Sequence, residues 1–406
     1  MTLTEQISTH NFKSFLWHAT FLAFAKNFMD VDTIVPAMLV EAGGGAMHIG
    51  IMTAIMLGGS SFTQLFFAPL VSNRSFKKSF LLLGINTRVS ALLGLGIILY
   101  LLTGEQKGYV LWLVFFFITT FSLAGAFTNI SYVDILGKSI NAEKRKTFFS
   151  ALQIISGVII LLAAFLVKKV LDWYEFPVNY ALMFFIGGGL LLIATGGFWM
   201  IKEVVPSSMK ISGIKDFLQI LKTELKQNKK LSYFLGFINT QGIAISFLPF
   251  IILYAKENFP SQSGDTGLFL IYKVVGIVFV SLLVLLGAKK AKYNWLLYSN
   301  VLLSISLALM ALFISDISSL KYIFVIGGIV YSLFTMSMNG LLLEISGNEN
   351  RSLYTGFAGA GNILPAIFPI IGGTIISLFG FYAFFILFML IVSSATFFIF
   401  KIDCIK

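Results

Sequence analysis

Twelve apolar stretches, each long enough to cross a bilayer, are divided into two sets of six by one polar, basic segment at residues 202–231. A hydrocarbon core about 30 Å thick needs roughly 20 apolar residues of helix for each crossing. Nearly all of the 406 residues belong to such stretches. The pattern therefore predicts a polytopic membrane protein.

Composition supports helices as the spanning elements. Hydrophobic residues make up 57% of the chain and charged residues only 12%, which is too apolar for a water-soluble core of this size. Runs such as 154–167 are apolar on every face, whereas a membrane strand alternates apolar and polar residues. The predicted fold class is an all-α integral membrane protein with twelve transmembrane helices, six in each half.

The predicted spans define the domains. The N-terminal bundle, 1–201, is expected to contain helices at 15–40, 47–70, 80–102, 109–135, 148–167 and 178–201. The C-terminal bundle, 232–406, is expected to contain helices at 232–255, 266–287, 295–314, 322–345, 353–378 and 381–400. Apolar residues at helical spacing between Ile214 and Leu225, with lysines on the other faces, predict a cytoplasmic amphipathic linker helix within 202–231.

Charge predicts the orientation. The loops and termini expected on one side carry 21 Lys and Arg against five on the other, so both termini are expected in the cytoplasm and the protein in the cell inner (plasma) membrane. A net charge of +11 spread over membrane loops does not favour a nucleic-acid partner. The first span carries Lys26, Asp30 and Asp32, which is unlike a cleavable signal peptide. Three histidines and one cysteine, Cys404, indicate no metal site, cofactor or disulfide, and we expect a monomer.

The two halves share local patterns. A shift of 213 residues places Phe21-Leu22-Ala23-Phe24 on Phe234-Leu235-Gly236-Phe237, Thr33 on Ser246 and Pro36 on Pro249. Asp134-Ile-Leu-Gly137 similarly matches Glu344-Ile-Ser-Gly347 after the fourth and tenth spans. Such repetition predicts two related bundles.

At this point the chain resembles the major facilitator superfamily of secondary transporters over essentially its whole length. The loop Ala68-Pro-Leu70-Val-Ser-Asn73-Arg74-Ser-Phe-Lys77-Lys78 is a degenerate form of that family's loop between its second and third helices, with Ser72 or Asn73 in place of the usual aspartate. The resemblance implies two six-helix bundles that rock about a central cavity. It also implies a site near the midplane, lined by the first, fourth, seventh and tenth helices.

Ionisable side chains at bilayer depth are costly, so each requires an explanation. The candidate proton or substrate residues are Lys26, Asp30, Asp32, Arg88 and Lys273. Asp30 is interpreted as the proton or substrate-charge site, and one of the three basic residues as a contact for an anionic group or as the charge that keeps Asp30 ionised. On a continuous first helix, Lys26 and Asp30 share a face, Asp32 points about 200° away from Asp30, and Asp30 lies near the midplane, where it can approach Lys273. The alternative is an ion pair that serves only helix packing.

Uncharged polar residues in the spans form a second group of candidates. Within the cavity they would hydrogen-bond a substrate, and the alternative is ordinary bonding between helices. The group comprises Asn129, Asn239, Gln241 and Asn339, together with Tyr132, Gln153 and Asn362.

Charged residues at the cytoplasmic ends of helices are interpreted as a gate. Salt bridges among them would hold the inner mouth shut in one state and break in the other, and the alternative is a solvated loop. The predicted gate residues are Arg74, Asp134, Arg145, Glu344 and Arg351.

These features favour a secondary active, proton-coupled transporter of a small organic solute that works by alternating access. No Gly-x-x-x-x-Gly-Lys-Ser/Thr motif is present, so ATP is not expected to drive it directly, and short loops poor in catalytic groups disfavour an enzyme. A facilitative uniporter and a non-transporting membrane sensor or scaffold of the same fold remain alternatives. The acids on the first span suit a cationic cargo, whereas Lys26, Arg88 and Lys273 suit an anionic one.

Overall fold

The computed structural model describes residues 3–72, 74–101, 107–207, 213–287, 293–346 and 351–402. Those residues form helices joined by short turns, with no strand among them. The first half of the chain contains α1 (Glu5–Phe28), α2 (Ile34–Glu41), α3 (Ala46–Ser72), α4 (Lys78–Tyr100), α5 (Lys107–Ser139), α6 (Ala142–Trp173) and α7 (Val178–Met200). The amphipathic helix predicted in the linker is present as α8 (Ile214–Gln227).

The second half begins with α9 and runs to the C-terminal end of the described chain. Its elements are α9 (Lys229–Gln241), the 3-10 helix η1 (Gly242–Ser246), α10 (Phe247–Asn258), α11 (Ser263–Gly287), α12 (Tyr293–Phe313), η2 (Ile317–Ser319), α13 (Leu320–Ser346), α14 (Arg351–Gly361) and α15 (Ile363–Ile402). The long α15 contains two predicted spans, separated at Gly380, whose φ of 79° is tolerated because glycine lacks a Cβ.

Eight segments of the described chain are long and apolar enough to cross a membrane, and one of them, Gly356–Ile402, has the length of two crossings. The first, second and fifth predicted spans are not among these segments but are also helical. The first is split into α1 and α2, the second is α3, and the fifth is α6, whose first turns are charged. The all-helical prediction is thus confirmed, and the chain is a multi-pass membrane protein.

Packing divides the helices into two compact units. One comprises Met1–Asp30 with Gly59–Leu218, and the other comprises Val31–Gly58 with Gln219–Lys406. The segment Val31–Gly58, which contains α2 and the first half of α3, therefore packs with the C-terminal helices although it belongs to the N-terminal half of the sequence. The division into bundles 1–201 and 232–406 stays a prediction.

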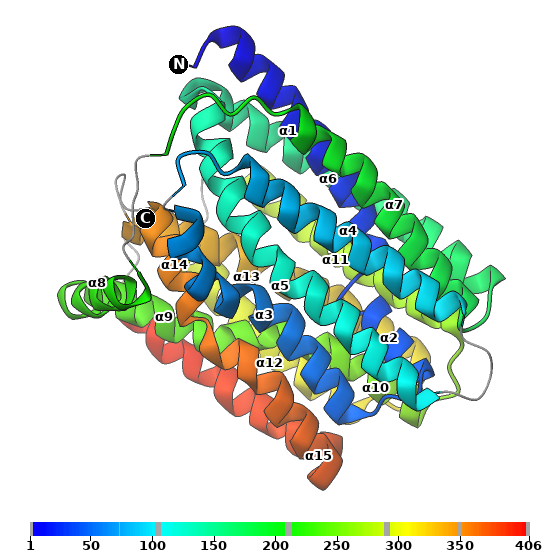
Figure 1. Ribbon diagram of the computed structural model, residues 1–406. Helices are drawn as coiled ribbons and strands as arrows, with labels where there is room; N and C mark the ends of the chain where they lie inside the picture. The colour runs from blue at the N-terminus through cyan, green and yellow to red at the C-terminus, as the bar shows by residue number, and fades with distance from the viewer. Residues whose placement is uncertain are drawn as a thin grey trace. The chain divides into compact units, whose positions relative to one another are not determined.

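In the first unit, small residues allow helices to approach closely, as is typical of membrane helix packing. The helices α1 and α7 lie against each other, as do α4 and α5 and α4 and α7 (Figure 1). A Cβ on Gly197 of α7 would lie 2.4 Å from the carbonyl oxygen of Ser14, and one on Gly84 of α4 would lie 2.8 Å from that of Ala124. Backbones this close leave no room for a methyl group at either glycine.

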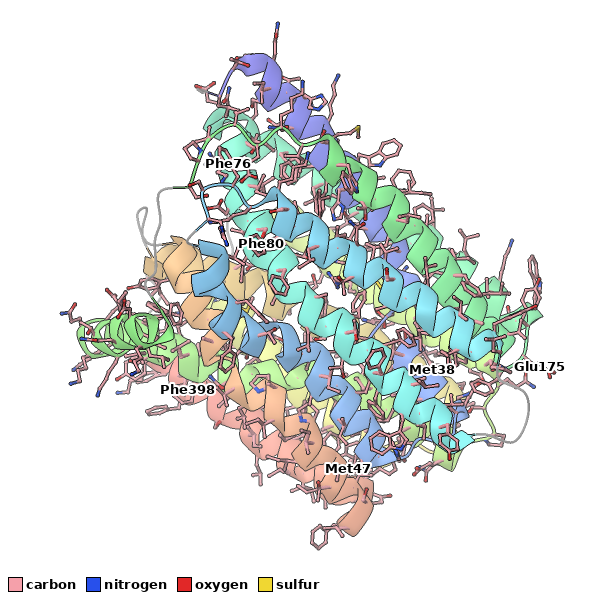
Figure 2. All side chains as sticks on the ribbon, in the orientation of Figure 1. Met38, Met47, Phe76, Phe80, Glu175 and Phe398 are labelled. Atoms are coloured by element: carbon pink, nitrogen blue, oxygen red, sulfur yellow. The ribbon has the colours of Figure 1, made fainter. Side chains whose placement is uncertain are left out.

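In the second unit, α15 packs against α9 and α12, and α11 packs against α13. Gly236 on α9 makes room for the ring of Phe398, which is labelled in Figure 2. The segment Val31–Gly58 joins this unit through a similar contact. A Cβ on Gly50 would lie 2.4 Å from the carbonyl oxygen of Pro369, and one on Gly373 would lie 2.6 Å from that of Ala46.

The first and seventh predicted spans are both interrupted. Between α1 and α2, residues 29–33 form turns, and between α9 and α10, residues 242–246 form the 3-10 helix. The same shift of 213 residues relates the helix ends. Phe28, the end of α1, corresponds to Gln241, the end of α9. Ile34, the start of α2, corresponds to Phe247, the start of α10. The two breaks therefore occupy equivalent positions in the two halves.

Candidate substrate and coupling site

The break between α1 and α2 places acidic residues in the membrane without a continuous helix around them. Asp30 is half-buried and Asp32 is buried, at 6% exposure. The eight residues of α2 separate Asp32 from the other end of the span, which amounts to about 12 Å of helix and brings Asp32 near the midplane. Unwound backbone at this depth occurs where it is buried in protein or lines a polar site.

Asp32 forms an ion pair with Lys273 of α11. The Nζ atom of Lys273 lies 2.5 Å from Oδ2 of Asp32, and only 5% of the Lys273 side chain and 9% of the Asp32 side chain are exposed. Removing one partner of such a buried pair leaves an uncompensated charge, at a cost of about 3–5 kcal/mol. The two residues thus depend on each other for their charged states.

Close packing of α11 on α13 fixes the position of Lys273. A Cβ on Gly328 of α13 would lie 1.9 Å from the carbonyl oxygen of Lys273, so any larger residue would push the two helices apart. The Nζ atom also lies 5.5 Å from the centroid of the Tyr331 ring, within the range of a cation–π contact. Backbone and side chain of Lys273 are both held by α13.

A second ion pair joins the far end of α2 to the C-terminal helices. The Nζ atom of Lys256 on α10 lies 2.7 Å from Oε1 of Glu41, and the hydroxyl of Ser263 on α11 donates to both carboxylate oxygens, at 3.2 and 3.1 Å. Together with the pair at Asp32, it ties both ends of α2 to this unit. Nothing in the sequence distinguishes Glu41, Lys256 or Ser263, because charged and polar residues are common near the ends of membrane spans.

The geometry predicted for Lys26 and Asp30 is wrong. It assumed a continuous helix over 15–40, but α1 ends at Phe28, so Asp30 does not follow Lys26 by one helical turn. For the same reason the predicted angle between Asp30 and Asp32 does not apply. Asp32 forms an ion pair with Lys273, and the expected approach of Asp30 to Lys273 stays a prediction.

The charges of Lys26 and Arg88, both in the first unit, interact unfavourably with each other. The guanidinium carbon of Arg88 lies 4.0 Å from the centroid of the Phe121 ring, and its buried Nε has no hydrogen-bond partner. Neither cation forms an ion pair with a carboxylate in the part of the chain that the structure describes. The first unit therefore holds two positive charges, those of Lys26 and Arg88, that repel each other.

Asn239 serves the packing of a broken helix. Its Oδ1 accepts hydrogen bonds from the backbone N–H groups of Ile363 and Leu364, at 3.1 and 2.8 Å, and its Nδ2 donates to the carbonyl oxygens of Gly361 and Leu235, at 2.6 and 2.8 Å. The side chain thus caps α15 where the eleventh span is interrupted at Asn362. This arrangement matches the interhelical alternative for Asn239.

Gln241 is fully buried and donates from Nε2 to the hydroxyl of Ser304 on α12, at 2.8 Å, while its Oε1 has no partner. Asn129 on α5 and Asn339 on α13 are both exposed. Exposure leaves their amides free to meet a solute, and their assigned role stays a prediction. The side chain of Gln153 lies outside the described residues.

Asp134, predicted as a gate residue, lies in an ion-pair network within the first unit. Its carboxylate oxygens lie 3.0 Å from Nζ of Lys77 and 2.9 Å from Nζ of Lys138, and it accepts a hydrogen bond from Ser207 at 2.7 Å. Lys138 also pairs with Glu203 at 2.8 Å. These contacts connect the start of α4, the end of α5 and the segment after α7.

Glu203 also caps α4. Its carboxylate accepts from the backbone N–H groups of Lys77, at 2.8 and 3.0 Å, and Lys78, at 2.8 Å. A negative charge there stabilises the N-terminus of the helix. The loop before α4 lacks the aspartate that the resemblance would lead one to expect. Glu203, from the segment after α7, supplies a negative charge at the start of α4 instead. Sequence spacing gives no signal for this contact, because 126 residues separate the partners.

For the other predicted gate residues, a role in gating stays a prediction. Arg145 donates from Nε to the carbonyl oxygen of Ile140, at 3.0 Å, and from Nη2 to that of Gly137, so it caps the end of α5. Arg74 and Glu344 are exposed. The side chain of Arg351, the residues Asn73 and Gly347–Glu349 and the loop lysines Lys289, Lys290 and Lys292 lie outside the described part of the chain.

Known transporters have the same arrangement of helices. A mutant of the nucleoside transporter NupG superposes with a TM-score of 0.69 at 13% sequence identity, covering 97% of this chain and 100% of that one. A POT family transporter in complex with a thioalcohol-conjugated peptide gives 0.70 at 12% identity, covering 96% of each chain. The D-xylose-proton symporter gives 0.64 at 14% identity, covering 97% and 99%.

Sequence comparison alone does not find such relatives. No family model matches the chain, and no curated protein matches it. At 11–14% identity the resemblance to solved structures establishes the architecture, which extends over almost the entire length of both chains. The chain therefore has the fold of the major facilitator superfamily of membrane transporters.

Proposed function

We propose that this chain is a secondary active transporter of a small organic solute, and that protonation of Asp32 couples the proton gradient to its movement. One observation carries the proposal. The buried Asp32–Lys273 ion pair joins the break in the first span to α11. In the proposed mechanism this pair lies near the midplane of the bilayer. A charge pair of this kind at the midplane is typical of an ion or proton pathway.

The pair gives protonation a mechanical consequence. When Asp32 is ionised, its attraction to Lys273 holds α2 on the C-terminal helices. When Asp32 is protonated, the attraction ends and Lys273 keeps a buried charge, so the packed state loses stability relative to a state in which α2 has moved away. A few kcal/mol suffices to exchange the populations of two such states.

The segment Val31–Gly58 provides the moving part. It is covalently continuous with the first unit through α1 and the second half of α3, yet it packs with the second unit. Alternating access by a rocking motion requires such a segment to separate from one unit and follow the other. In the proposed orientation both termini are cytoplasmic, in the inner (plasma) membrane, and Val31–Gly58 lies in the outer half of the bilayer.

Proton flux into or out of proteoliposomes tests the proposal without a labelled substrate. Vesicles containing the full chain and the pH dye pyranine would be exposed to uridine, a dipeptide, D-xylose and succinate, which represent nucleoside, peptide, sugar and acid solutes. We expect at least one solute to change the lumen pH. The change should be lost in Asp32→Asn and kept in Asp316→Asn, which alters an exposed acid at η2.

Each alternative has its own result. A solute that enters without moving protons indicates a facilitative uniporter. Vesicles that move none of the solutes indicate a sensor or scaffold. Coupled flux that persists unchanged in Asp32→Asn overturns the role of Asp32.

A further inference from the structure

The basic pair Lys26 and Arg88 has a charge that the helices around it do not balance. Arg88 is the eleventh residue of the 23-residue α4, so about 15 Å or more of helix separates it from either end. The side chain is too short to reach the interface by snorkelling from that depth. Its positive charge must therefore be accommodated inside the membrane.

Nearby groups increase the positive potential. Lys26 and Arg88 interact unfavourably with each other, and both are close enough to act electrostatically on His18, whose Nδ1 donates to the carbonyl oxygen of Ala194 at 3.1 Å. In the described residues, no carboxylate pairs with Lys26 or Arg88. The Asp32–Lys273 ion pair shows that another buried cation of this chain is paired with an acid.

Arg88 is also arranged as a binding group. The guanidinium carbon of Arg88 lies 4.0 Å from the centroid of the Phe121 ring, which is itself buried. The buried Nε of Arg88 has no hydrogen-bond partner among the described residues, and the Lys26 side chain is exposed. A guanidinium held on an aromatic ring with an unused N–H presents a fork that fits a carboxylate or phosphate, and a free ammonium beside it adds a second donor.

We infer that Lys26 and Arg88 form an anion-binding site and that the cargo of the transporter carries a carboxylate or phosphate group. The inference rests on the proposed transport function and decides the alternative that the sequence left open. Asp32 is disposed differently, because it is neutralised by Lys273. A cationic cargo would add a third positive charge to a pair that already lacks an acid partner.

Thermal unfolding of the purified full chain in detergent tests the site without a gradient. At constant ionic strength, the probes would be inorganic phosphate, succinate and benzoate, with benzamide and benzylamine as neutral and cationic matches for benzoate. We expect one or more anions to raise the Tm by about 2 °C or more, and the amide and the amine to leave it unchanged. The rise should be lost in Lys26→Gln and Arg88→Gln and kept in Lys169→Gln, which removes a lysine outside the pair.

The same variants report on the unliganded protein. Removing one of two repelling charges should leave the Tm without added anion unchanged or higher, whereas a purely structural pair of cations would lose stability. The inference is overturned if no anion stabilises the protein, if benzamide does so equally, or if both variants respond to anions as the wild type does. Loss of proton-coupled flux with anion binding intact would contradict only the proposed coupling.

Discussion

At the level of single residues, two kinds of charged group occur within the helices: a buried ion pair and two basic residues that repel each other. Asp32 and Lys273 are buried together and neutralise each other. Lys26 and Arg88 repel each other, and neither pairs with an acid among the described residues. The first arrangement suits a switch that protonation releases, and the second suits recognition of an anion.

The Asp32–Lys273 pair predicts a strong coupling between mutations. Asp32→Asn or Lys273→Gln alone should lower the free energy of unfolding by about 3–5 kcal/mol, because each leaves one buried charge or polar group uncompensated. The double variant should recover much of the loss. Thermal or denaturant unfolding of the four proteins forms a double-mutant cycle, and additive losses would show that the two residues do not interact.

A surface pair predicts a small dependence on pH. Lys144 donates a hydrogen bond to Glu5 at 2.6 Å, and this bond with the positive charge of Lys144 holds the pKa of Glu5 below its usual 4.5. An acid whose pKa is lowered by folding contributes stability above its unfolded pKa and loses it as the pH falls through the folded value. The Tm difference between wild type and Glu5→Gln should thus be present above about pH 4.5 and vanish below it.

Glu5 is fully exposed, so the effect is small and sensitive to salt. Glu175→Gln, which replaces another exposed acid, provides the control. A Tm difference that grew on acidification would have the wrong sign for this mechanism.

At the scale of elements, interrupted helices recur at equivalent places in the two halves. The breaks at 29–33 and 242–246 are related by the shift of 213 residues, but their side chains differ, since Asp30 and Asp32 correspond to Ile243 and Ile245. Only the first break carries charge. Proton coupling is therefore expected from the first break, with the second providing flexibility alone.

The cap on the eleventh span depends on one amide. Asn239→Leu removes acceptors for two backbone N–H groups and should destabilise the protein by about 1–3 kcal/mol. Asn339→Leu makes the same replacement at an exposed position and should change the Tm little. Equal Tm values for Asn239→Leu and wild type would contradict a capping role.

The crossing of α11 and α13 depends on glycine. Gly328→Ala places a methyl group within 1.9 Å of the Lys273 carbonyl oxygen and should displace the lysine, lowering both the Tm and proton-coupled flux. The matched control is Gly189→Ala on α7, where a Cβ meets nothing within 4 Å. Wild-type flux in Gly328→Ala would show that the exact position of Lys273 is unimportant.

The sequence predicted the spans and the candidate charges more reliably than their partners. Apolar length sufficed for most helices, and the repeat correctly related the first and seventh spans. Periodicity assumes an unbroken helix, however, so it missed the end of α1 at Phe28 and did not predict the ion pair between Asp32 and Lys273. The Glu203 cap and the Asn239 cap join residues more than 120 apart, which no local pattern reveals.

In the molecule as a whole, the segment Val31–Gly58 belongs to the N-terminal half of the sequence but packs with the C-terminal helices. It follows α1 in the chain and packs with α10, α11 and α15 through two ion pairs and two glycine contacts. Under the proposed mechanism these contacts form when Asp32 is ionised and open when it is protonated. The distance between this segment and α10 should therefore increase as the pH falls.

Distances between spin labels on this segment and on α10 test that claim most directly. Labels at Met47→Cys on α3 and Glu257→Cys on α10, in a Cys404→Ser background and in lipid nanodiscs, would be measured by pulsed electron resonance at neutral and acidic pH. Both positions are exposed, and Met47 is labelled in Figure 2. We predict one short distance at neutral pH, a second, longer population that grows on acidification, and the longer population at every pH in Asp32→Asn. A single short distance at all pH values, in wild type and in Asp32→Asn alike, would contradict the account.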